Sequence, residues 1–307
     1  MKIVKANVEL IPQSFGLKGV YKQIEMAGRT AYKSEDKITD TSAEKFVNML
    51  MTRKHNAALE HGTIYLKYRC KWEGDALTNF YERNPYSEVV AKYNKDDYEN
   101  GWAMSTFYIT TNYRVIVENN RSGDLKYMSL PYNKHVKRYT LKFTLSRGIA
   151  NEFVRHRVFS FLQESTRYCN YSKDKFGNEL TFIIPEKLNI LIEGRCYFNN
   201  GVTWSINPFN GSVWDTQFIN SDFVNQKEIE EWLNSLRVSS NTYFRLLNIY
   251  NWKPEEARDV LPLDLKTELI MTGTTEQWRE FCNLRCASGA HPDARYLANK
   301  VKELINF

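Results

Sequence analysis

The sequence predicts one α/β domain that spans residues 1–307 and carries two insertions. Three observations lead to this prediction. Hydrophobic residues make up 42% and charged residues 25% of the chain, values that are typical of a folded globular protein. Segments with helical periodicity alternate with segments rich in β-branched and aromatic residues. No internal repeat or low-complexity tract interrupts the 307 residues, a length sufficient for a substantial core.

The first 72 residues are predicted to contain two strands and two helices. Residues 2–11 favour a strand, and a helix is predicted to follow it through about Ser34. The run Thr41-Ser42-Ala43-Glu44 matches a capping box and predicts the start of a second helix. Apolar residues alternate over residues 62–72, and this alternation predicts a second strand.

The middle of the chain is predicted to alternate between polar insertions and strands. Residues 73–104 are polar and predict a surface insertion. Thr106–Glu118 and Tyr139–Leu145 are rich in β-branched and aromatic residues and predict strands. Residues 173–225 predict a second irregular zone, and its part from 190 to 225 is the second insertion.

The C-terminal part is predicted to be mainly helical. A long helix is expected from about Gln226 to Tyr250, and a strand near 265–271. Proline residues mark further boundaries. Pro254 is expected to open a helix that stops before Pro262, and Pro292 is expected to open the last helix. Thr274 or Thr275 is expected to begin a helix that runs through Cys286. The apolar face of the last helix is expected to consist of Leu297, Val301 and Leu304.

Charge and cysteine content exclude several classes of protein. The net charge of +6 suits anionic ligands but falls short of a nucleic-acid-binding signature. The five cysteines lack the spacing of a disulfide framework or a zinc site, so no metal is expected. The N-terminus does not have the pattern of a signal peptide, and no apolar run approaches 20 residues. We therefore expect a reduced cytoplasmic protein that binds neither a membrane nor a nucleic acid.

The segment with the clearest chemical content is Arg155-His156-Arg157, then seven residues, then Ser165-Thr166-Arg167-Tyr168. Arginine presents a planar fork of donors that matches phosphate, so the segment is suited to an anionic ligand. The alternative is a solvated basic surface with a satisfied histidine. Apolar neighbours argue against that alternative, because charge embedded in an apolar framework usually has a partner. Ser165 lacks the G-x-S-x-G context of a nucleophile, which favours a hydrogen-bonding role.

Three further elements are weak by themselves. Ala257-Arg258-Asp259-Val260-Leu261-Pro262 and Asn283-Leu284-Arg285 each place an arginine near a helix end, where a salt bridge is an equally good explanation. His55-Asn56-Ala57-Ala58-Leu59-Glu60-His61 is, taken alone, more typical of a helix end than of a ligand set.

Together and in this order, these elements resemble the motifs of the flavin-dependent thymidylate synthases. That family carries Arg-His-Arg, seven residues and Ser, followed by Ala-Arg-x-x-Leu-Pro and Leu-Arg elements, and preceded by His-x-x-x-x-Glu-His. The resemblance covers residues 29–68, 138–172 and 253–298, roughly half of the chain. The predicted insertions lie outside it.

The resemblance implies a single domain with a central, mostly antiparallel sheet flanked by helices. It implies a methyltransferase that converts dUMP to dTMP. In this reaction 5,10-methylenetetrahydrofolate is the carbon donor, FAD the hydride carrier and NADPH the reductant, without an enzyme cysteine nucleophile. It also implies a homotetramer whose active sites lie at subunit interfaces.

The resemblance further assigns roles to individual residues. Arg285 would be catalytic, because a guanidinium on the uracil edge stabilises negative charge that builds on the ring. The residues implied to bind dUMP are Glu152, Phe153, Val154, Arg155, Gln163, Glu164, Ser165, Thr166, Arg167, Arg258 and Arg285. The residues implied to bind FAD are His55, Ala57, Arg155, His156, Arg157, Gln163, Thr274, Glu276 and Glu280.

Some positions depart from the family pattern. Glu152 stands where members can carry Gln, and Gly289 where some carry a flavin-contacting His. Thr274, Glu276 and Glu280 stand where Asn and Arg side chains can contact FAD. An inactive nucleotide-binding relative is therefore one alternative function. A module that binds RNA or DNA through its basic and aromatic surface is a second.

Overall fold

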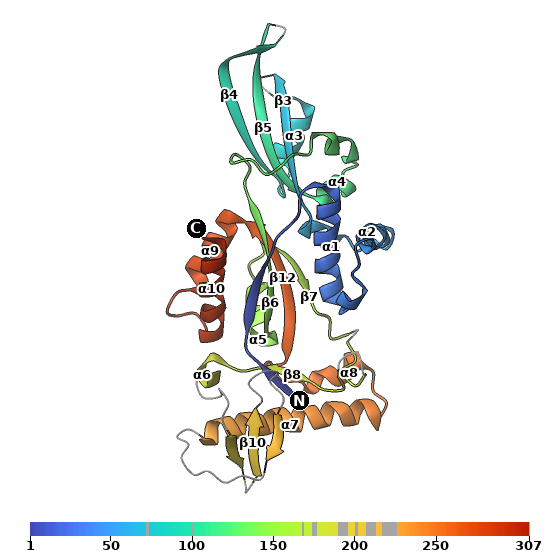
Figure 1. Ribbon diagram of the computed structural model, residues 1–307, viewed down its shortest axis with the longest axis vertical. Helices are drawn as coiled ribbons and strands as arrows, with labels where there is room; N and C mark the ends of the chain where they lie inside the picture. Colours follow the sequence, from blue (N-terminus) through green and yellow to red (C-terminus); the bar gives the residue numbers. More distant parts are fainter. Residues whose placement is uncertain are drawn as a thin grey trace.

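A computed structural model describes residues 1–71, 74–99, 101–167, 169–173, 177–189, 196–199, 202–206, 213–216 and 226–306. The molecule is elongated, with three parts along its longest axis (Figure 1). A central sheet with helices on both sides forms the middle. A second sheet forms the upper part, and helix α7 with small strands forms the lower part.

The central sheet has four strands in the order β2-β6-β12-β7, and every neighbouring pair is antiparallel. The strands are β2 (Asn7–Ile11), β6 (Arg138–Ser146), β7 (Ser160–Gln163) and β12 (Lys266–Thr274). The strands expected at Tyr139–Leu145 and near 265–271 are confirmed as β6 and β12. The expected central antiparallel sheet with flanking helices is also confirmed.

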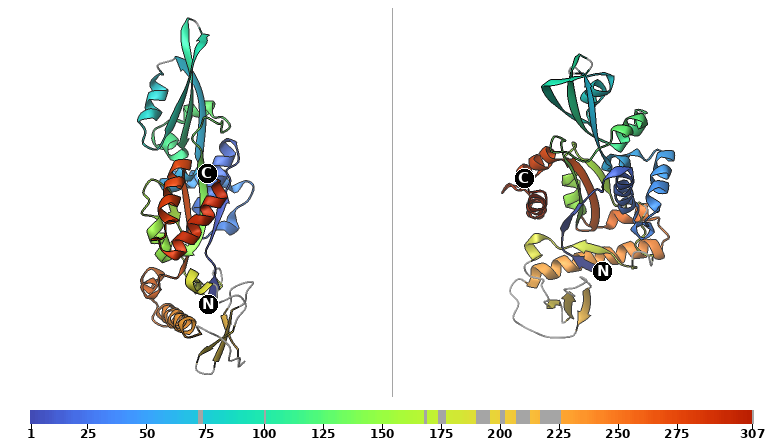
Figure 2. Two further views of the ribbon diagram at one scale, coloured as in Figure 1. Left: turned by 90° about the vertical axis from the view of Figure 1, so that its left-hand side faces the viewer. Right: turned by 45° about the horizontal axis from the view of Figure 1, so that its top comes forward.

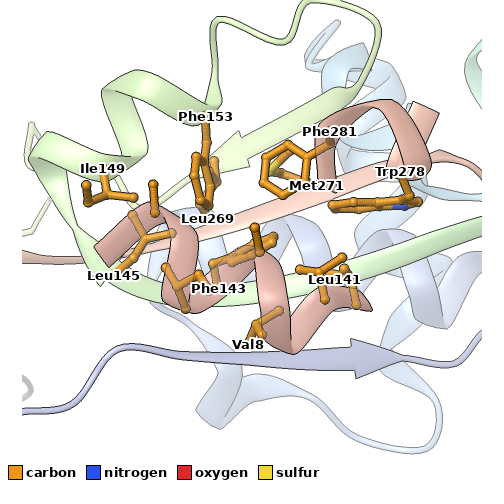
Figure 3. Packing of buried hydrophobic residues seen from close by; sticks show 14 of the residues in the cluster. Val8, Leu141, Phe143, Leu145, Ile149, Phe153, Leu269, Met271, Trp278 and Phe281 are labelled. Atoms are coloured by element: carbon orange, nitrogen blue, oxygen red, sulfur yellow. The ribbon is translucent and has the colours of Figure 1, made fainter. Parts of the chain in front are cut away.

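The two faces of this sheet differ in polarity, because side chains alternate along each strand. The apolar face packs against α5 (Arg147–Phe153), α9 (Thr275–Arg285) and α10 (Pro292–Ile305) (Figure 3). Its buried strand residues are Val8, Leu141, Phe143, Leu145, Leu269 and Met271. The opposite face carries polar residues and meets α1 (Gly16–Tyr32).

The N-terminal segment differs from expectation in two respects. The strand expected at 2–11 is divided, since β1 (Lys2–Val4) pairs with β8 (Thr181–Ile183) and only β2 joins the central sheet. Helix α2 (Ser42–Thr52) is confirmed, but its predicted capping box is wrong because Thr41 makes no side-chain cap. The Ser42 hydroxyl instead donates to the buried Glu25 carboxylate (2.9 Å), so α1 determines how this helix begins. The short helices η1 (Glu35–Lys37) and η2 (Asn56–His61) follow α1 and α2 respectively.

The upper sheet has the strand order β3-β5-β4 and includes most of the predicted first insertion. Its elements are β3 (Thr63–Lys71), α3 (Ala76–Arg83), β4 (Glu88–Glu99), β5 (Trp102–Asn112), α4 (Tyr113–Glu118) and η3 (Ser122–Tyr127). Residues 73–104 are thus not only surface, since Tyr81 is fully buried and donates to Asp124 (2.9 Å). The strand expected at Thr106–Glu118 ends at Asn112, whose side chain accepts from the Val115 amide (3.1 Å) and caps α4.

The lower part holds the predicted irregular zone, part of which is regular. Beyond β8, this part comprises α6 (Glu186–Asn189), β9 (Cys196–Asn199), β10 (Val202–Ile206), β11 (Val213–Thr216), α7 (Gln226–Asn248), α8 (Pro254–Ala257) and η5 (Arg258–Val260). Strands β9, β10 and β11 form an antiparallel sheet, so the expectation of irregular structure is wrong there. Residues 174–176, 190–195, 200–201, 207–212 and 217–225 of that zone lie outside the described residues. The long helix α7 and the helix start at Pro254 are confirmed.

The last two helices begin where the sequence predicts. Thr274 caps α9 by accepting from the Gln277 amide (3.3 Å), and Pro292 opens α10. Leu304 is 38% exposed and does not join the buried face, which ends in Val301 and Ile305 instead. Within the described part of the chain, no helix is long and apolar enough to cross a membrane.

Candidate functional site

The Arg285 guanidinium is held at three points where the end of α9 meets the end of α5. Its Nη1 donates to Glu152 Oε2 (2.6 Å), its Nη2 to the Glu152 main-chain oxygen (2.8 Å) and its Nε to His156 Nε2 (2.9 Å). The arginine side chain is 18% exposed. Three contacts of this kind leave the planar guanidinium little rotational freedom, so it is a fixed, partly accessible cation.

His156 is neutral in this arrangement. Burial, followed by the positive charge of Arg285, lowers the pKa of His156 below its usual value. Its Nε2 accepts the hydrogen bond from Arg285, so the ring proton is assigned to Nδ1. The ring also packs on Phe281, with ring centroids 5.0 Å apart.

The three residues of the Arg-His-Arg motif point in different directions. His156 turns toward α9, whereas Arg155 and Arg157 are exposed. Among the described residues, neither exposed guanidinium has a hydrogen-bond or ion-pair partner. The preceding Phe153 is fully buried against Phe143 and Phe281, and Val154 packs against the same core. A ligand would therefore reach the main chain of Phe153 and not its ring (Figure 3).

A second cluster joins two other predicted nucleotide residues. Arg258 Nη1 donates to Thr166 Oγ1 (3.1 Å) across 92 positions of sequence. Both residues line a pocket of about 310 Å³ together with Arg147, Asn151 and Leu263. Arg147 Nη1 is buried and has no hydrogen-bond partner among the described residues. The pocket therefore combines two guanidinium groups with a threonine hydroxyl. Its lining also includes Asp259, whose exposed carboxylate lies 4.0 Å from Arg258 Nε.

The sequence reasoning missed Arg147 and Asn151. Both lie on α5, four residues apart, and so share one side of the helix that leads into the Arg-His-Arg motif. The four-residue spacing of Arg147 and Asn151 could have indicated a shared polar site. It is a weak indication unless Arg258 is known to lie nearby.

The remaining residues of the predicted nucleotide loop have mixed environments. Gln163 Nε2 lies 3.4 Å from Thr267 Oγ1, and Ser165 is partly exposed. Arg167 is exposed and lies 3.7 Å from a Glu255 carboxylate oxygen. Tyr168 lies outside the described residues.

The carboxylate of Glu164 is buried in an ionic cluster between the sheet and α1. Lys266 (3.3 Å), Lys33 (3.7 Å) and the Tyr171 hydroxyl (3.1 Å) surround it. With these partners it faces the protein interior, so any contact of Glu164 with a nucleotide would come from its main chain.

Glu268 is at the centre of the same cluster. Its carboxylate pairs with Lys33 (2.5 Å), Lys266 (3.0 Å) and Lys142 (3.1 Å). Burial alone would raise the pKa of Glu268, but the charges of the three lysines lower it to about 2. Burial lowers and the glutamates raise the pKa of Lys33, and the net direction is upward. Glu268 and Lys33 are therefore both charged at neutral pH, and the cluster fastens the end of α1 to β6 and β12.

The segments that carry the predicted FAD residues, η2 and α9, each contact β12. His61 on η2 is fully buried, and its Nδ1 lies 2.8 Å from the hydroxyl of Thr272, two residues before Thr274. Burial, followed by the charge of Arg138, lowers the pKa of His61 to about 3, so this ring is neutral. Ala57 on η2 and His55, which directly precedes it, are exposed, and His55 Nδ1 lies 2.6 Å from the Tyr32 hydroxyl.

The predicted FAD residues on and before α9 provide few free side-chain donors for a flavin. The Thr274 hydroxyl is engaged as a helix cap, and Glu276 pairs with Arg279. Glu280 is exposed. Gly289 is open, because a Cβ there would meet no atom within 4 Å. No group of three or more His, Cys, Asp or Glu side chains that could hold a metal occurs among the described residues.

Comparison with known proteins identifies related sequences. The probable flavin-dependent thymidylate synthase of Paramecium bursaria Chlorella virus 1 is 25% identical over 172 residues, covering 54% of this chain and 65% of the relative. The flavin-dependent thymidylate synthase of Corynebacterium efficiens is 27% identical over 154 residues, which cover 50% of this chain and 51% of that relative. The flavin-dependent thymidylate synthase of Aquifex aeolicus is 22% identical over 331 residues, which cover 95% of this chain and 96% of that relative. The chain thus spans about half to two thirds of the first two relatives.

The solved structures include a UMP/dUMP methylase, PolB, from Streptomyces cacaoi bound with 5-Br dUMP. It is 16% identical with a TM-score of 0.42, covering 99% of this chain and 92% of that chain. The family model described as "Thymidylate synthase complementing protein" matches residues 134–306. These residues are more than half of the chain and include α5, the Arg-His-Arg motif, Arg258 and Arg285. The chain therefore belongs to the thymidylate synthase complementing protein family.

Proposed function

We propose that this protein is a flavin-dependent thymidylate synthase that methylates dUMP to dTMP. 5,10-Methylenetetrahydrofolate would donate the carbon, and NADPH would be the reductant. The observation that carries the proposal is the position of the Arg285 guanidinium, which hydrogen bonds to Glu152 and to His156 of the Arg-His-Arg motif hold in place. Carbon 5 of uracil becomes nucleophilic only as negative charge builds on the ring, and a preorganised cation stabilises that charge.

The nucleotide phosphate would bind in the pocket lined by Thr166, Arg258 and Arg147. Two guanidinium groups and a hydroxyl match the acceptor oxygens of a phosphate. The unpartnered, buried Nη1 of Arg147 supports this assignment, because a buried donor without an acceptor is costly. Ser165, Arg167, Gln163 and the main chain around Glu164 would complete the nucleotide site.

FAD, which would carry the hydride, fits only part of the predicted donor set. Arg155 and Arg157 are exposed and unpartnered among the described residues, which suits the two phosphates of FAD. Neutral His156 can donate from Nδ1. The carboxylates of Glu276 and Glu280 would repel a diphosphate, so contacts from α9, as from Ala57, would use the main chain.

Three buried cysteines support a reaction without an enzyme thiolate. Cys70, Cys169 and Cys282 are buried, and burial raises the pKa of Cys282 to about 12. A thiol with a raised pKa is a poor nucleophile. The free thiols also suit the cytoplasm, the compartment that we propose.

The reaction can be tested directly by measuring dTMP formation from dUMP, 5,10-methylenetetrahydrofolate and NADPH, with and without added FAD. We expect product that depends on FAD. Absence of product while dUMP still binds would favour the inactive nucleotide-binding relative. Binding to polynucleotide, with log affinity falling linearly against log salt concentration, would favour the nucleic-acid-binding alternative.

We also propose a homotetramer with active sites at subunit interfaces. The site residues on one chain are spread over η2, α5, α9 and η5, and large apolar side chains are exposed on and after α7, at Val238, Ile249, Tyr250 and Trp252. Exposed apolar groups of this kind are typical of a protein–protein interface. Sedimentation velocity should give the mass of four chains. A fully active monomer would contradict the shared-site proposal.

Replacing Glu152 by Gln should strengthen dUMP binding. The carboxylate now occupies Arg285 donors that the uracil edge would need, and an amide holds a guanidinium less tightly than a carboxylate. We expect the Kd of dUMP, measured by calorimetry at fixed salt, to fall by roughly three- to tenfold. Glu303→Gln, which removes an exposed charge on α10, should leave the Kd unchanged. Equal or weaker binding by the Glu152 variant would show that the carboxylate itself contacts the nucleotide.

A further inference from the structure

The upper sheet lies next to one end of the central sheet (Figure 2). A cavity of about 460 Å³ is lined by residues from both sheets. It is lined by the segment after β2, by β3, by residues 128–131 and by the start of β6. Leu10, Pro12, Met128, Leu130 and Pro131 form apolar walls. The volume falls within the roughly 300–1,000 Å³ of small-molecule pockets.

The lining of the cavity is basic. It includes Arg138 and Lys137 but no Asp or Glu. Among the described residues, the Arg138 guanidinium donates to neutral oxygens, namely the Glu60 carbonyl (3.2 Å), Thr63 Oγ1 (3.4 Å) and Ser160 Oγ (3.5 Å). Burial lowers the pKa of Arg138 to about 10. No described carboxylate lies within ion-pair distance of it. The nearest acidic influence is the charge of Glu60, which raises the pKa of Arg138 but is itself ion-paired with Arg114.

Tyr65 supplies a second donor in the same wall. Its hydroxyl oxygen accepts from the Arg138 amide (3.3 Å), and its proton has no acceptor among the described residues. The Gln13 amide is already engaged with the Thr63 main chain in both directions (2.7 and 2.8 Å). A guanidinium and a hydroxyl therefore line the cavity without a direct ion-pair partner among the described residues.

We propose that this cavity binds a small organic oxyanion. Its carboxylate or phosphate would lie against Arg138 and Tyr65, and its body against the apolar walls. The site goes beyond the proposed thymidylate chemistry, since Tyr65 and residues 128–131 precede the stretch that the family model matches. The occupant should combine an anionic group with an apolar body. A purely inorganic anion would leave the apolar walls without a partner, and a purely apolar molecule would leave Arg138 without one.

The test is calorimetric titration of the full chain with benzoate, phenyl phosphate, inorganic phosphate and the neutral benzyl alcohol. We expect benzoate or phenyl phosphate to bind at least tenfold more tightly than benzyl alcohol and inorganic phosphate. The tighter of the two organic anions distinguishes a carboxylate ligand from a phosphate ester. Tyr65→Phe keeps the ring and removes the donor, and should weaken anion binding by about tenfold.

Lys137→Gln, at an exposed position on the cavity rim, provides a second variant that should fold normally. We expect it to weaken binding about threefold. Lys134→Gln, which removes an equally exposed charge outside the lining, should have no effect. The proposal is overturned if the organic anions bind no better than benzyl alcohol. It is equally overturned if both cavity variants bind like the Lys134 control, because Arg138 would then only tie the two sheets together.

Discussion

Arg285→Ala should reduce kcat for dTMP formation by about 10²–10³-fold, the loss that follows removal of one preorganised donor in an active site. The side chain lies at the surface end of α9, and Glu152 is 32% exposed, so water can replace the lost partner. The fold should therefore persist, with an unchanged circular dichroism spectrum. Steady-state kinetics at saturating dUMP separate this effect from weaker binding.

Arg279→Ala is the matched control, since Arg279 is on the same helix but is exposed and paired with Glu276. We expect this variant to keep its kcat. If Arg285→Ala retains activity within tenfold of the unaltered protein, the catalytic role of Arg285 is wrong. The guanidinium would then serve only to join α9 to α5.

Glu268→Gln should lower the free energy of unfolding by about 3 kcal/mol, because removal of one partner from a buried ionic cluster leaves the others uncompensated. Lys33, Lys142 and Lys266 retain only 15–20% side-chain exposure, so water cannot fully hydrate them. The depression of the Glu268 pKa from 4.5 to about 2 corresponds to a free energy of similar size. Urea denaturation at pH 7 would measure the change.

The pH dependence provides an internal check. Because the folded-state pKa of Glu268 is below the unfolded value, its contribution is complete above about pH 4.5 and is lost as pH falls toward 2. The difference between the unaltered protein and Glu268→Gln should therefore shrink over that interval. Glu228→Gln, which breaks the exposed pair with Lys187, should cost less than about 1 kcal/mol at any pH. An equal cost for both variants at pH 7 would contradict the assignment.

Local pattern was a reliable guide to most of the fold. Proline and threonine at helix starts, together with apolar periodicity, predicted α7, α8, α9 and α10, because these signals act within a few residues. The errors arose where distant contacts outweigh local preference. Tyr113–Glu118 has strand-like composition, yet the Asn112 cap and burial of Tyr113, Val115 and Ile116 make it helical. Residues 73–104 appear polar, but β4 gains its stability by pairing with β5.

The candidate site was predictable as a set of residues but not as a geometry. Motif order brought Arg155, Arg258 and Arg285 to attention, and family membership is confirmed. The individual ligand roles remain predictions. The pairing of Arg285 with Glu152 joins residues 133 positions apart, and no local pattern indicates it. The inward placement of Glu164 was likewise hidden, because it depends on Lys33, directly after α1, and on Lys266 of β12.

By itself, the sequence determined the family, the α/β class and the helices whose ends carry their own caps. These properties depend on residue spacing, which acts over one or two turns. The tertiary structure alone decided that the face of the central sheet toward α1 carries an ionic cluster. It also decided that Glu152 holds Arg285 and that Arg138 and Tyr65 line a cavity. Each of these depends on strands and helices that are distant in sequence but adjacent in space, where burial makes charge pairing far stronger than in water.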